Sequence, residues 1–421
     1  MVAPAGHSGG KLVAAAEATI NHLCRDIPER PVGSAGNRAA TDFFARQIAA
    51  FGFAIERSPF TCLDWQEEGA DLLVGDTSFP VQVSPYSVGG RATGPLVVVS
   101  TVAELAAANP AGKILLVRGD LTREQLMPKN FTFYNPEQHQ QIIHLLETKA
   151  PLAIIAATSR NPELAGGIYP FPLIEDGDFD IPSVYMTAET GEELTRHAGE
   201  TVSLTINATR IPATGENIVA RKGGRKGGRK ECASGKRIVI CAHIDAKINT
   251  PGALDNATGV TILLLLAELL SGYAGELAVE IVPLNGEDYY AASGHMLYIQ
   301  QNTGKFDSIL LAANCDLAGY HTGSTAYSLY DCPPDVAAAV QQAFASRPDT
   351  IAGEQWFQSD HSIFIQQGVP AIAITSERFM ELSATITHTP KDRPELVDPA
   401  RLVHIAQALH DLIHHLNHHQ R

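Results

Sequence analysis

Short apolar runs alternate with helix-like apolar repeats through the second half of the chain. The predicted strands cover residues 237–242, 277–284, 308–314 and 371–375, and the predicted helices cover residues 260–270, 294–301, 335–345 and 399–418. Strands that alternate with helices in this way predict an α/β fold. We expect a mostly parallel, mixed sheet that is covered by helices on both faces.

The first part of the chain carries two more helical repeats, at residues 11–25 and 37–53. Ser34 and Asn37 are the candidate N-terminal caps of the second of these helices. The pattern then changes, because residues 62–211 contain short β-type runs that are separated by turns and a few helices. We therefore expect a discontinuous main domain, residues 1–61 and 212–421, with a smaller β-rich domain, residues 62–211, inserted into it.

Composition and charge exclude several classes of protein. The net charge of −15 argues against a nucleic-acid partner. The longest apolar stretch, residues 262–270, contains Glu268 and is too short to span a membrane. The N-terminal residues lack a charged leader followed by an apolar core, which favours a cytoplasmic protein; a secreted or periplasmic location stays open for a trimmed chain. The sequence leaves the oligomeric state open.

One segment stands out by charge alone. Residues 221–230 read RKGGRKGGRK, a short repeat of basic residues and glycines. Glycine gives such a segment flexibility, and a few basic residues do not make a nucleic-acid site in a chain this acidic. We expect a solvated hairpin loop here.

Histidine and carboxylate side chains gather where the predicted strands end. His243 and Asp245 follow the first of these strands, and Asp255 precedes the next helix. The second strand is followed by Glu287 and Asp288. Because the carboxyl ends of parallel strands meet at one edge of a sheet, we expect these side chains to lie close together.

Two further residues extend this pattern. Asp316 follows the third strand, and His388 lies in a polar loop near the end of the chain. A single His-x-Asp or Glu-Asp pair is usually a cap or a solvated turn. Packing does not require all of these residues at one edge, so their joint occurrence points to a metal site. Imidazole nitrogen and carboxylate oxygen are ligands of zinc.

The motifs of this region resemble those of peptidase family M28, two-zinc exopeptidases that include bacterial leucyl aminopeptidases and glutamate carboxypeptidases. The matching motifs are AHID (242–245), GALDNATG (252–259), NGED (285–288), NCDLAG (314–319), SDHSIF (359–364) and THTPKD (387–392). The segment RPVGSAGNRAATDFF (30–44) also looks like that family's opening. The inserted β-rich domain resembles the protease-associated domain that some members carry.

The resemblance implies two Zn²⁺ ions per chain, with Co²⁺ and Mn²⁺ as alternatives. The ligands that it implies are Asp255 as the bridge, His243 and Asp316 at one site, and Asp288 and His388 at the other. It makes Glu287 the general base and Asp245 the residue that orients His243. The family commonly has Glu at the position of Asp288, and it tends to have a cis peptide bond after the bridging Asp.

The activity that the resemblance implies is hydrolysis of the N-terminal peptide bond of peptide substrates. Asp360, His361 and Glu377 are the candidate residues of the substrate pocket. A carboxypeptidase or a dipeptidase of the same family is the nearest alternative. The more distant alternatives are a glutaminyl-cyclase-like zinc transferase and a non-catalytic binding protein on the same scaffold. The sequence does not show which side chains the enzyme prefers.

Overall fold

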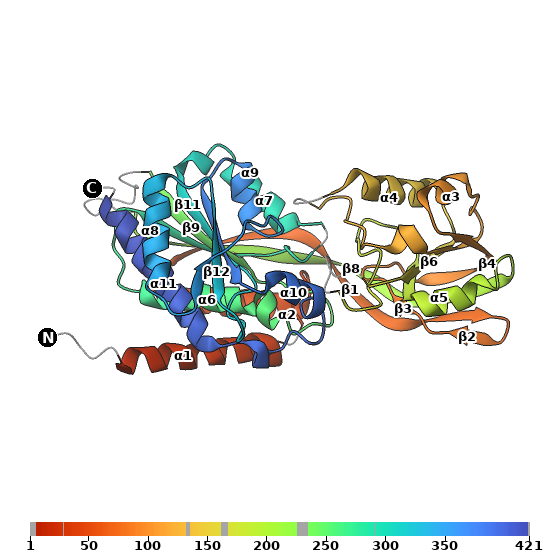
Figure 1. The fold of residues 1–421 in the computed structure, drawn as a ribbon, viewed down its shortest axis with the longest axis horizontal. Coiled ribbons are helices and arrows are strands. Elements are labelled where there is room, and N and C mark those ends of the chain that lie inside the picture. Colours follow the sequence, from red (N-terminus) through yellow and green to blue (C-terminus); the bar gives the residue numbers. More distant parts are fainter. Residues whose placement is uncertain are drawn as a thin grey trace. The chain divides into compact units, whose positions relative to one another are not determined.

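The computed structural model describes residues 6–27, 29–131, 135–160, 167–224, 235–289 and 291–419. The chain divides into two compact units (Figure 1). The first unit is built from Met1–Thr61, Thr214–Phe379 and His388–Arg421, and the second from Cys62–Ala213 and Met380–Thr387. Most of the basic repeat at residues 221–230 lies outside the described residues.

A seven-stranded arrangement forms the centre of the first unit. Its strands are β9 (Arg237–His243), β10 (Ala278–Leu284), β11 (Ile309–Cys315), β12 (Thr325–Tyr330), β13 (Thr350–Ala352), β14 (Ala371–Ser376) and the end of β8 (Thr201–Lys222). They lie in the order β13, β12, β14, β11, β9, β10, β8. Strands β14, β11, β9 and β10 are parallel. β12 pairs antiparallel with β14 and parallel with β13, and β8 pairs antiparallel with β10. The continuous apolar run of β9 suits this central position, where both faces of the strand are buried.

Helices flank these strands (Figure 1). They are α1 (Gly6–Asn21), α2 (Ala35–Ala50), α6 (Thr258–Leu269), α7 (Ser293–Asn302), α8 (Pro334–Ala345), α9 (His361–Gln366) and α11 (Pro399–His419), with the helical turns η1 (His22–Asp26), η3 (Ala253–Ala257), η4 (Phe306–Ser308) and η5 (Pro394–Leu396). Helix α6 packs on β9, β10 and β11, and α9 packs on β11 and β14. The predicted α/β class, with a mostly parallel sheet between helices, is confirmed.

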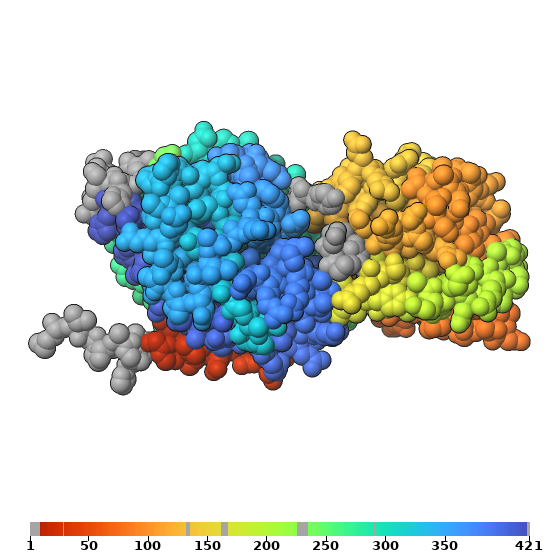
Figure 2. Space-filling view, viewed as in Figure 1, coloured from red at the N-terminus to blue at the C-terminus, as the bar shows by residue number. Residues whose placement is uncertain are grey.

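Helix α6 is apolar on every side because it is covered on every side. It packs on the strands and against α11 and α1, and its residues from Thr258 to Ala267 are all buried. Helix α1 packs against α11, and Figure 2 shows the red residues of α1 beside blue residues of the C-terminal part of the chain. None of the helices in the described ranges is long and apolar enough to cross a membrane.

Parallel pairing brings the ends of the central strands to one edge. His243 at the end of β9 pairs in register with Leu284 at the end of β10, and Asn314 near the end of β11 pairs with Cys241. The residues that follow β9, β10 and β11 therefore leave the sheet at the same level. Gly259 allows α6 to approach this edge closely, because a Cβ at this position would lie 2.4 Å from the carbonyl oxygen of Cys315.

The N-terminal segment joins the first unit through α2. This helix begins after Ser34, whose hydroxyl accepts a hydrogen bond of 3.0 Å from the backbone N–H of Asn37. Ser34, one of the two predicted candidates, is therefore the N-terminal cap of α2. The side chain of Asn37 points inward and forms a reciprocal pair of amide hydrogen bonds, of 2.8 and 2.9 Å, with Asn285.

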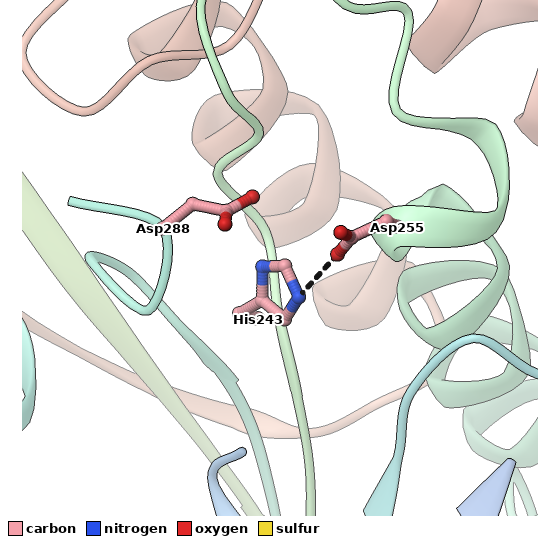
Figure 3. A group of neighbouring side chains, drawn as sticks. All are labelled: His243, Asp255 and Asp288. Atoms are coloured by element: carbon pink, nitrogen blue, oxygen red, sulfur yellow. Dashed lines mark ion pairs between the residues drawn. The ribbon is translucent and has the colours of Figure 1, made fainter. Parts of the chain in front are cut away.

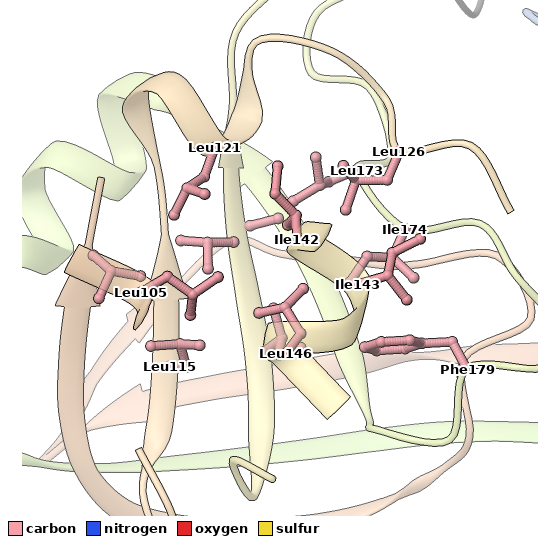
Figure 4. Close-up of a cluster of buried hydrophobic side chains, with 14 residues drawn as sticks. Leu105, Leu115, Leu121, Leu126, Ile142, Ile143, Leu146, Leu173, Ile174 and Phe179 are labelled. Carbon is pink, nitrogen blue, oxygen red and sulfur yellow. The ribbon is translucent and has the colours of Figure 1, made fainter. Parts of the chain in front are cut away.

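The second unit has its own mixed sheet and core. Its strands are β2 (Thr77–Phe79), β3 (Gln82–Val83), β4 (Gly90–Val99), β5 (Ile114–Val117), β6 (Ala153–Thr158) and β7 (Ser183–Thr187), its helices are α3 (Val102–Ala107), α4 (Glu137–Lys149), α5 (Ala188–Thr195) and α10 (Phe379–Thr385), and η2 (Gly119–Thr122) is a helical turn. Strands β4 to β7 are parallel. Apolar side chains of α4, among them Ile142 and Leu146, pack with Leu115 of β5 and Phe179 in this core (Figure 4).

Two long strands take the chain from one unit to the other. β1 (Ala54–Val74) contains the boundary at Thr61, and β8 contains the boundary at Ala213. The predicted inserted domain was residues 62–211. The structure groups Met380–Thr387 with the second unit as well, a segment that the sequence pattern assigned to the main domain.

Candidate metal centre

The five predicted metal ligands come from four loops at the carboxyl edge of the first unit's sheet. His243 ends β9, Asp288 lies in the loop after β10, and Asp316 directly follows β11. Asp255 lies in η3, just before α6, and His388 precedes η5. The structure thus brings together side chains that are as much as 145 residues apart in the chain.

Asp255 lies between the two histidines. Its Oδ1 atom is 3.0 Å from Nε2 of His243, and its Oδ2 atom is 3.0 Å from Nε2 of His388. The peptide bond between Asp255 and Asn256 is cis. The side chain of Asn256 donates to the carbonyl of Cys315 and accepts from the N–H of Gly259, which fixes this turn against β11 and α6.

Each histidine has a second carboxylate beside it. Nε2 of His243 lies 3.5 Å from Oδ1 of Asp316, and Nε2 of His388 lies 3.2 Å from Oδ1 of Asp288. Two groups of three side chains therefore share Asp255. Figure 3 shows His243, Asp255 and Asp288 turned toward one another, and one ligand atom from each lies within 4.8 Å of the others.

The arrangement of these side chains suits coordination of a metal ion better than it suits hydrogen bonding among the side chains themselves. Nε2 of His243, Oδ2 of Asp288 and Oδ1 of Asp316 are buried and have no hydrogen-bond partner among the described residues. The ligand atoms of a tetrahedral zinc ion, with bonds of about 2.0–2.1 Å, lie about 3.3 Å apart. The four separations of 3.0–3.5 Å within the two groups match that spacing. The donor set of imidazole nitrogen and carboxylate oxygen is one that zinc takes.

The charges of the centre also call for a cation. Burial alone would lower the pKa of His388, but the carboxylates of Asp288 and Asp255 outweigh this and raise it to about 10. Burial opposes protonation of His243 too, yet Glu287 and the other nearby carboxylates raise the pKa of His243 well above its ordinary value. Carboxylates thus outnumber imidazoles here, and protons on the imidazoles offset part of the charge. A divalent cation would displace those protons.

Asp245 holds the loop after β10. Its Oδ1 accepts hydrogen bonds from the N–H groups of Gly286, at 2.7 Å, and Glu287, at 3.3 Å, and its Oδ2 accepts one of 2.9 Å from Asp288. The ring of His243 is held instead by the backbone carbonyl of Asp245, 3.1 Å from Nδ1, whereas the carboxylate lies 3.9 Å away. A carbonyl can only accept, so Nδ1 carries the proton and Nε2 is left as the ligand atom.

Glu287 lies at the rim of the centre. Its Oε2 atom is 4.0 Å from Nε2 of His243, and its side chain is mostly buried. Burial raises the pKa of Glu287 well above its ordinary value, against the opposing effect of His243. A raised pKa makes a carboxyl group a stronger proton acceptor, and general acid–base catalysis uses such groups.

The three predicted pocket residues are in different surroundings. Asp360 is fully buried, and its Oδ1 is 2.7 Å from Nε2 of His295. His361 is also fully buried and donates from Nε2 to the carbonyl of Trp356, at 2.7 Å. Glu377 is exposed and accepts a hydrogen bond from the N–H of Ser324. Their role in a pocket stays a prediction.

The structure adds residues that sequence reasoning missed. Nζ of Lys247 donates to the backbone carbonyl of Asp288, at 3.1 Å, and lies 4.0 Å from its carboxylate. The carboxylate of Asp392 accepts hydrogen bonds from the N–H groups of Leu254 and Asp255. Asp392 belongs to the motif THTPKD, which was a signal for its importance; Lys247 had no such signal.

Three comparisons relate the chain to known proteins. Residues 217–413 match the family model "Peptidase family M28". The probable lipoprotein aminopeptidase LpqL of Mycobacterium tuberculosis is 22% identical over 376 residues, which are 84% of this chain and 71% of that protein. The protease-associated character of the second unit stays a prediction.

Solved structures share the fold over nearly the whole chain. An aminopeptidase from Aneurinibacillus sp. strain AM-1 matches with a TM-score of 0.73 and 21% identity, over 96% of this chain and 93% of that one. The zinc aminopeptidase BSAP from Bacillus subtilis matches with a TM-score of 0.72 and 18% identity, over 96% and 94%. The family match confirms the resemblance seen in the motifs: residues 217–413, just under half of the chain, match peptidase family M28, and the chain is a hydrolase of the peptidase class.

Proposed function

We propose that the chain is a zinc-dependent aminopeptidase, which removes the N-terminal residue of a peptide. The match of residues 217–413 to family M28 and the names of the similar proteins, which are aminopeptidases, support this choice. The observation that carries the proposal is the position of Asp255. Each of its carboxylate oxygens lies 3.0 Å from a different imidazole, which is the arrangement of a carboxylate that bridges two metal ions.

Two zinc ions would be held by the two groups of side chains. His243 and Asp316 would complete one site, and His388 and Asp288 would complete the other, with Asp255 shared. All five donors are nitrogen or carboxylate oxygen, so Co²⁺ and Mn²⁺ would also be accepted. Asp288 is a shorter ligand than the Glu that the family commonly has, and Lys247 lies beside it. We therefore expect this second site to be the weaker one.

Glu287 would carry out the proton transfers. When bound, the metal ions would lower the pKa of a water molecule and polarise the scissile carbonyl. Glu287 would take a proton from the attacking water and later give it to the leaving amine. Asp245 would keep Glu287 in place, because its carboxylate holds the backbone on both sides of that residue.

The alternatives differ in what they would do with a peptide. A carboxypeptidase or dipeptidase would use the same centre but hold the other end of the substrate. A glutaminyl-cyclase-like transferase would need one zinc ion and would release ammonia from an N-terminal glutamine. A non-catalytic binding protein would bind peptide without turnover.

A substrate panel separates these proposals. Amino-acyl p-nitroanilides and N-blocked peptides are incubated with the zinc-loaded protein, with and without a chelator. We expect the unblocked amides to be cleaved, the N-blocked peptides to be spared, and the chelator to abolish cleavage. Cleavage of blocked peptides from the carboxyl end would replace the aminopeptidase with a carboxypeptidase. Failure to cleave any amide after zinc loading would contradict the enzyme itself.

A further inference from the structure

Arg30 is buried inside the first unit, with 1% of its surface exposed. Its guanidinium group donates four hydrogen bonds, all to backbone carbonyls: two of 2.6 and 3.2 Å to Leu23 and Ile244, and two of 2.9 and 2.8 Å to Pro251 and Gly252. Two of these carbonyls belong to the loop that leads to Asp255. An arginine is rarely buried so completely without a reason, since its charge loses its hydration.

Asp392 binds the backbone N–H groups of the same loop. This residue is fully buried, and its two carboxylate oxygens accept hydrogen bonds of 2.7 Å from the N–H of Leu254 and 3.0 Å from the N–H of Asp255. The carbonyl of Asp392 also accepts a hydrogen bond of 3.4 Å from the N–H of Ala253. Arg30 and Asp392 therefore hold the backbone of residues 251–255 by its carbonyl groups and by its N–H groups, respectively.

The loop leaves no room for a side chain at position 252. This residue has a positive φ of 58°, and a Cβ at this position would lie 2.5 Å from the carbonyl oxygen of Asp255 and 2.8 Å from Nη2 of Arg30. The glycine thus lets the guanidinium approach the backbone. The close contact and the hydrogen bonds act on the same few residues, immediately before the proposed bridging ligand.

The backbone of Arg30 and its neighbours reaches the other loops of the centre too. The carbonyl of Arg30 accepts from the N–H of Ala246, which follows Asp245. Asn37 pairs with Asn285, which precedes the loop of Glu287 and Asp288. All of residues 30–37 lie outside the stretch 217–413 that matches the family model. These contacts connect the metal centre to a segment more than two hundred residues away in the chain.

Packing alone does not account for these two charges. A buried charge loses its hydration, so burial of Arg30 and Asp392 would cost stability without the hydrogen bonds that each forms with the backbone. Hydrogen bonds from a guanidinium, or to a carboxylate, do fix backbone groups in direction as well as in distance. The hydrogen bonds of Arg30 and Asp392 therefore restrict the backbone geometry of the loop 251–255.

We propose that Arg30 and Asp392 are positioning residues for Asp255: together they fix the backbone of residues 251–255 so that the two carboxylate oxygens face the two imidazoles. This inference rests on the proposed role of Asp255 as the bridge between two zinc ions. Neither residue contacts the zinc ions or the substrate in this scheme. Their effect is on how well the centre is formed before zinc arrives.

The test compares the full-length wild type with Arg30→Met and Asp392→Asn. Arg30→Met keeps most of the apolar volume and removes the donors. Asp392→Asn keeps the shape and replaces one acceptor with an NH₂ group. Arg46→Met, which changes an exposed arginine of α2, is the matched control. Two quantities are measured: the dissociation constant for zinc, by competition with a chelating dye, and the hydrogen exchange of the peptide that covers residues 251–256.

We expect each of the two variants to bind zinc about 10–100-fold more weakly, which corresponds to losing one or two charge-assisted hydrogen bonds. We also expect faster exchange in residues 251–256 of the zinc-free protein, with β9 and β11 unchanged. A general loss of structure would instead speed exchange in the strands as well. Arg30→Lys, which keeps a charge and part of the hydrogen bonding, should restore part of the affinity.

Unchanged zinc affinity and unchanged exchange at residues 251–256 in the two variants would overturn the inference. If Arg30→Met does not fold, Asp392→Asn decides the question, because it changes no volume. If the wild type itself binds no zinc, the proposed function fails instead. The exchange measurement on zinc-free protein would then still show whether Arg30 and Asp392 fix the loop.

Discussion

The side-chain carboxylate of Asp245 accepts a hydrogen bond of 2.9 Å from the backbone N–H of Asp288. The other oxygen of the same carboxylate holds the N–H groups of Gly286 and Glu287. The loop that carries the proposed general base and one proposed ligand thus wraps around a single buried side chain. The carboxylate of Asp245 thus connects the end of β9 to the segment of the next loop that carries Glu287 and Asp288.

Replacing Asp245 with Asn should release this loop. One carboxylate oxygen becomes an NH₂ group that faces a backbone N–H, so at least one charge-assisted hydrogen bond is lost. We expect the free energy of unfolding to fall by about 2–3 kcal/mol and kcat to fall more than tenfold. Urea unfolding and the turnover of an amino-acyl p-nitroanilide measure the two effects. Wild-type turnover in a variant with normal stability would show that the loop does not need this anchor.

Glu287→Gln tests the general base. The amide cannot accept the proton of the attacking water, while its size and its position beside His243 are kept. We expect kcat to fall by about 10²–10⁴-fold, with the zinc content unchanged. Glu395→Gln, at an exposed glutamate that pairs with Arg25, should behave as the wild type does. Near-normal turnover of Glu287→Gln would assign the base to another residue.

Asp316→Asn and Asp288→Asn separate the two proposed metal sites. Each replaces one carboxylate ligand with a neutral amide oxygen, a weaker zinc ligand, beside a different histidine. We expect each variant to hold one zinc ion per chain instead of two, as measured by plasma emission spectrometry after removal of free metal. A variant that keeps both ions would show that its carboxylate is not a ligand.

His361 should make the zinc-free protein sensitive to mild acid. Burial lowers the pKa of this histidine to about 4, below its ordinary value of 6.5. Between pH 6.5 and pH 4 the unfolded chain binds a proton that the folded chain does not, so stability falls as the pH falls. We expect a loss of about 2 kcal/mol between pH 7 and pH 5 from this residue.

The measurement for His361 is urea unfolding at both pH values, in the presence of a chelator, for the wild type and His361→Gln. The variant starts less stable, because the hydrogen bond to Trp356 is disturbed. Its further loss between pH 7 and pH 5 should be smaller than that of the wild type by about 2 kcal/mol. Equal losses in the two proteins would place the acid sensitivity elsewhere.

The apolar runs of the second half predicted β9, β10, β11 and β14, because a buried parallel strand is apolar throughout. The helical repeats predicted α6, α7, α8 and α11, but not the short helix α9 between β11 and β14. β12 (Thr325–Tyr330), which pairs antiparallel with β14, was missed, since Ser328 and two tyrosines interrupt its apolar pattern. The sequence pattern also predicts separate short strands at residues 53–61 and 71–74, where the structure has the single strand β1, and at residues 202–207 and 216–221, where it has β8. Each strand contains a stretch without buried residues, residues 66–71 in β1 and residues 207–214 in β8, which interrupts its buried pattern.

The site residues at strand ends could be predicted because parallel pairing places strand ends together. The contacts that organise them could not. Nothing in the spacing of His243 and Asp245 shows that the carboxylate turns to a loop 41 to 43 residues away rather than to the imidazole. The burial of Arg30 could not be predicted either, because arginine is usually exposed. Its four hydrogen-bond acceptors are backbone carbonyls, which every residue has, so they leave no signal in the sequence.

The number of zinc ions in the wild-type protein tests the central claim most directly. The protein is stripped with a chelator, titrated with Zn²⁺ in a calorimeter, and its bound zinc is then counted by plasma emission spectrometry. Asp255, with one oxygen beside each imidazole, predicts two ions per chain in the wild type. A single zinc ion per chain, or none, in a folded wild-type protein would contradict the account.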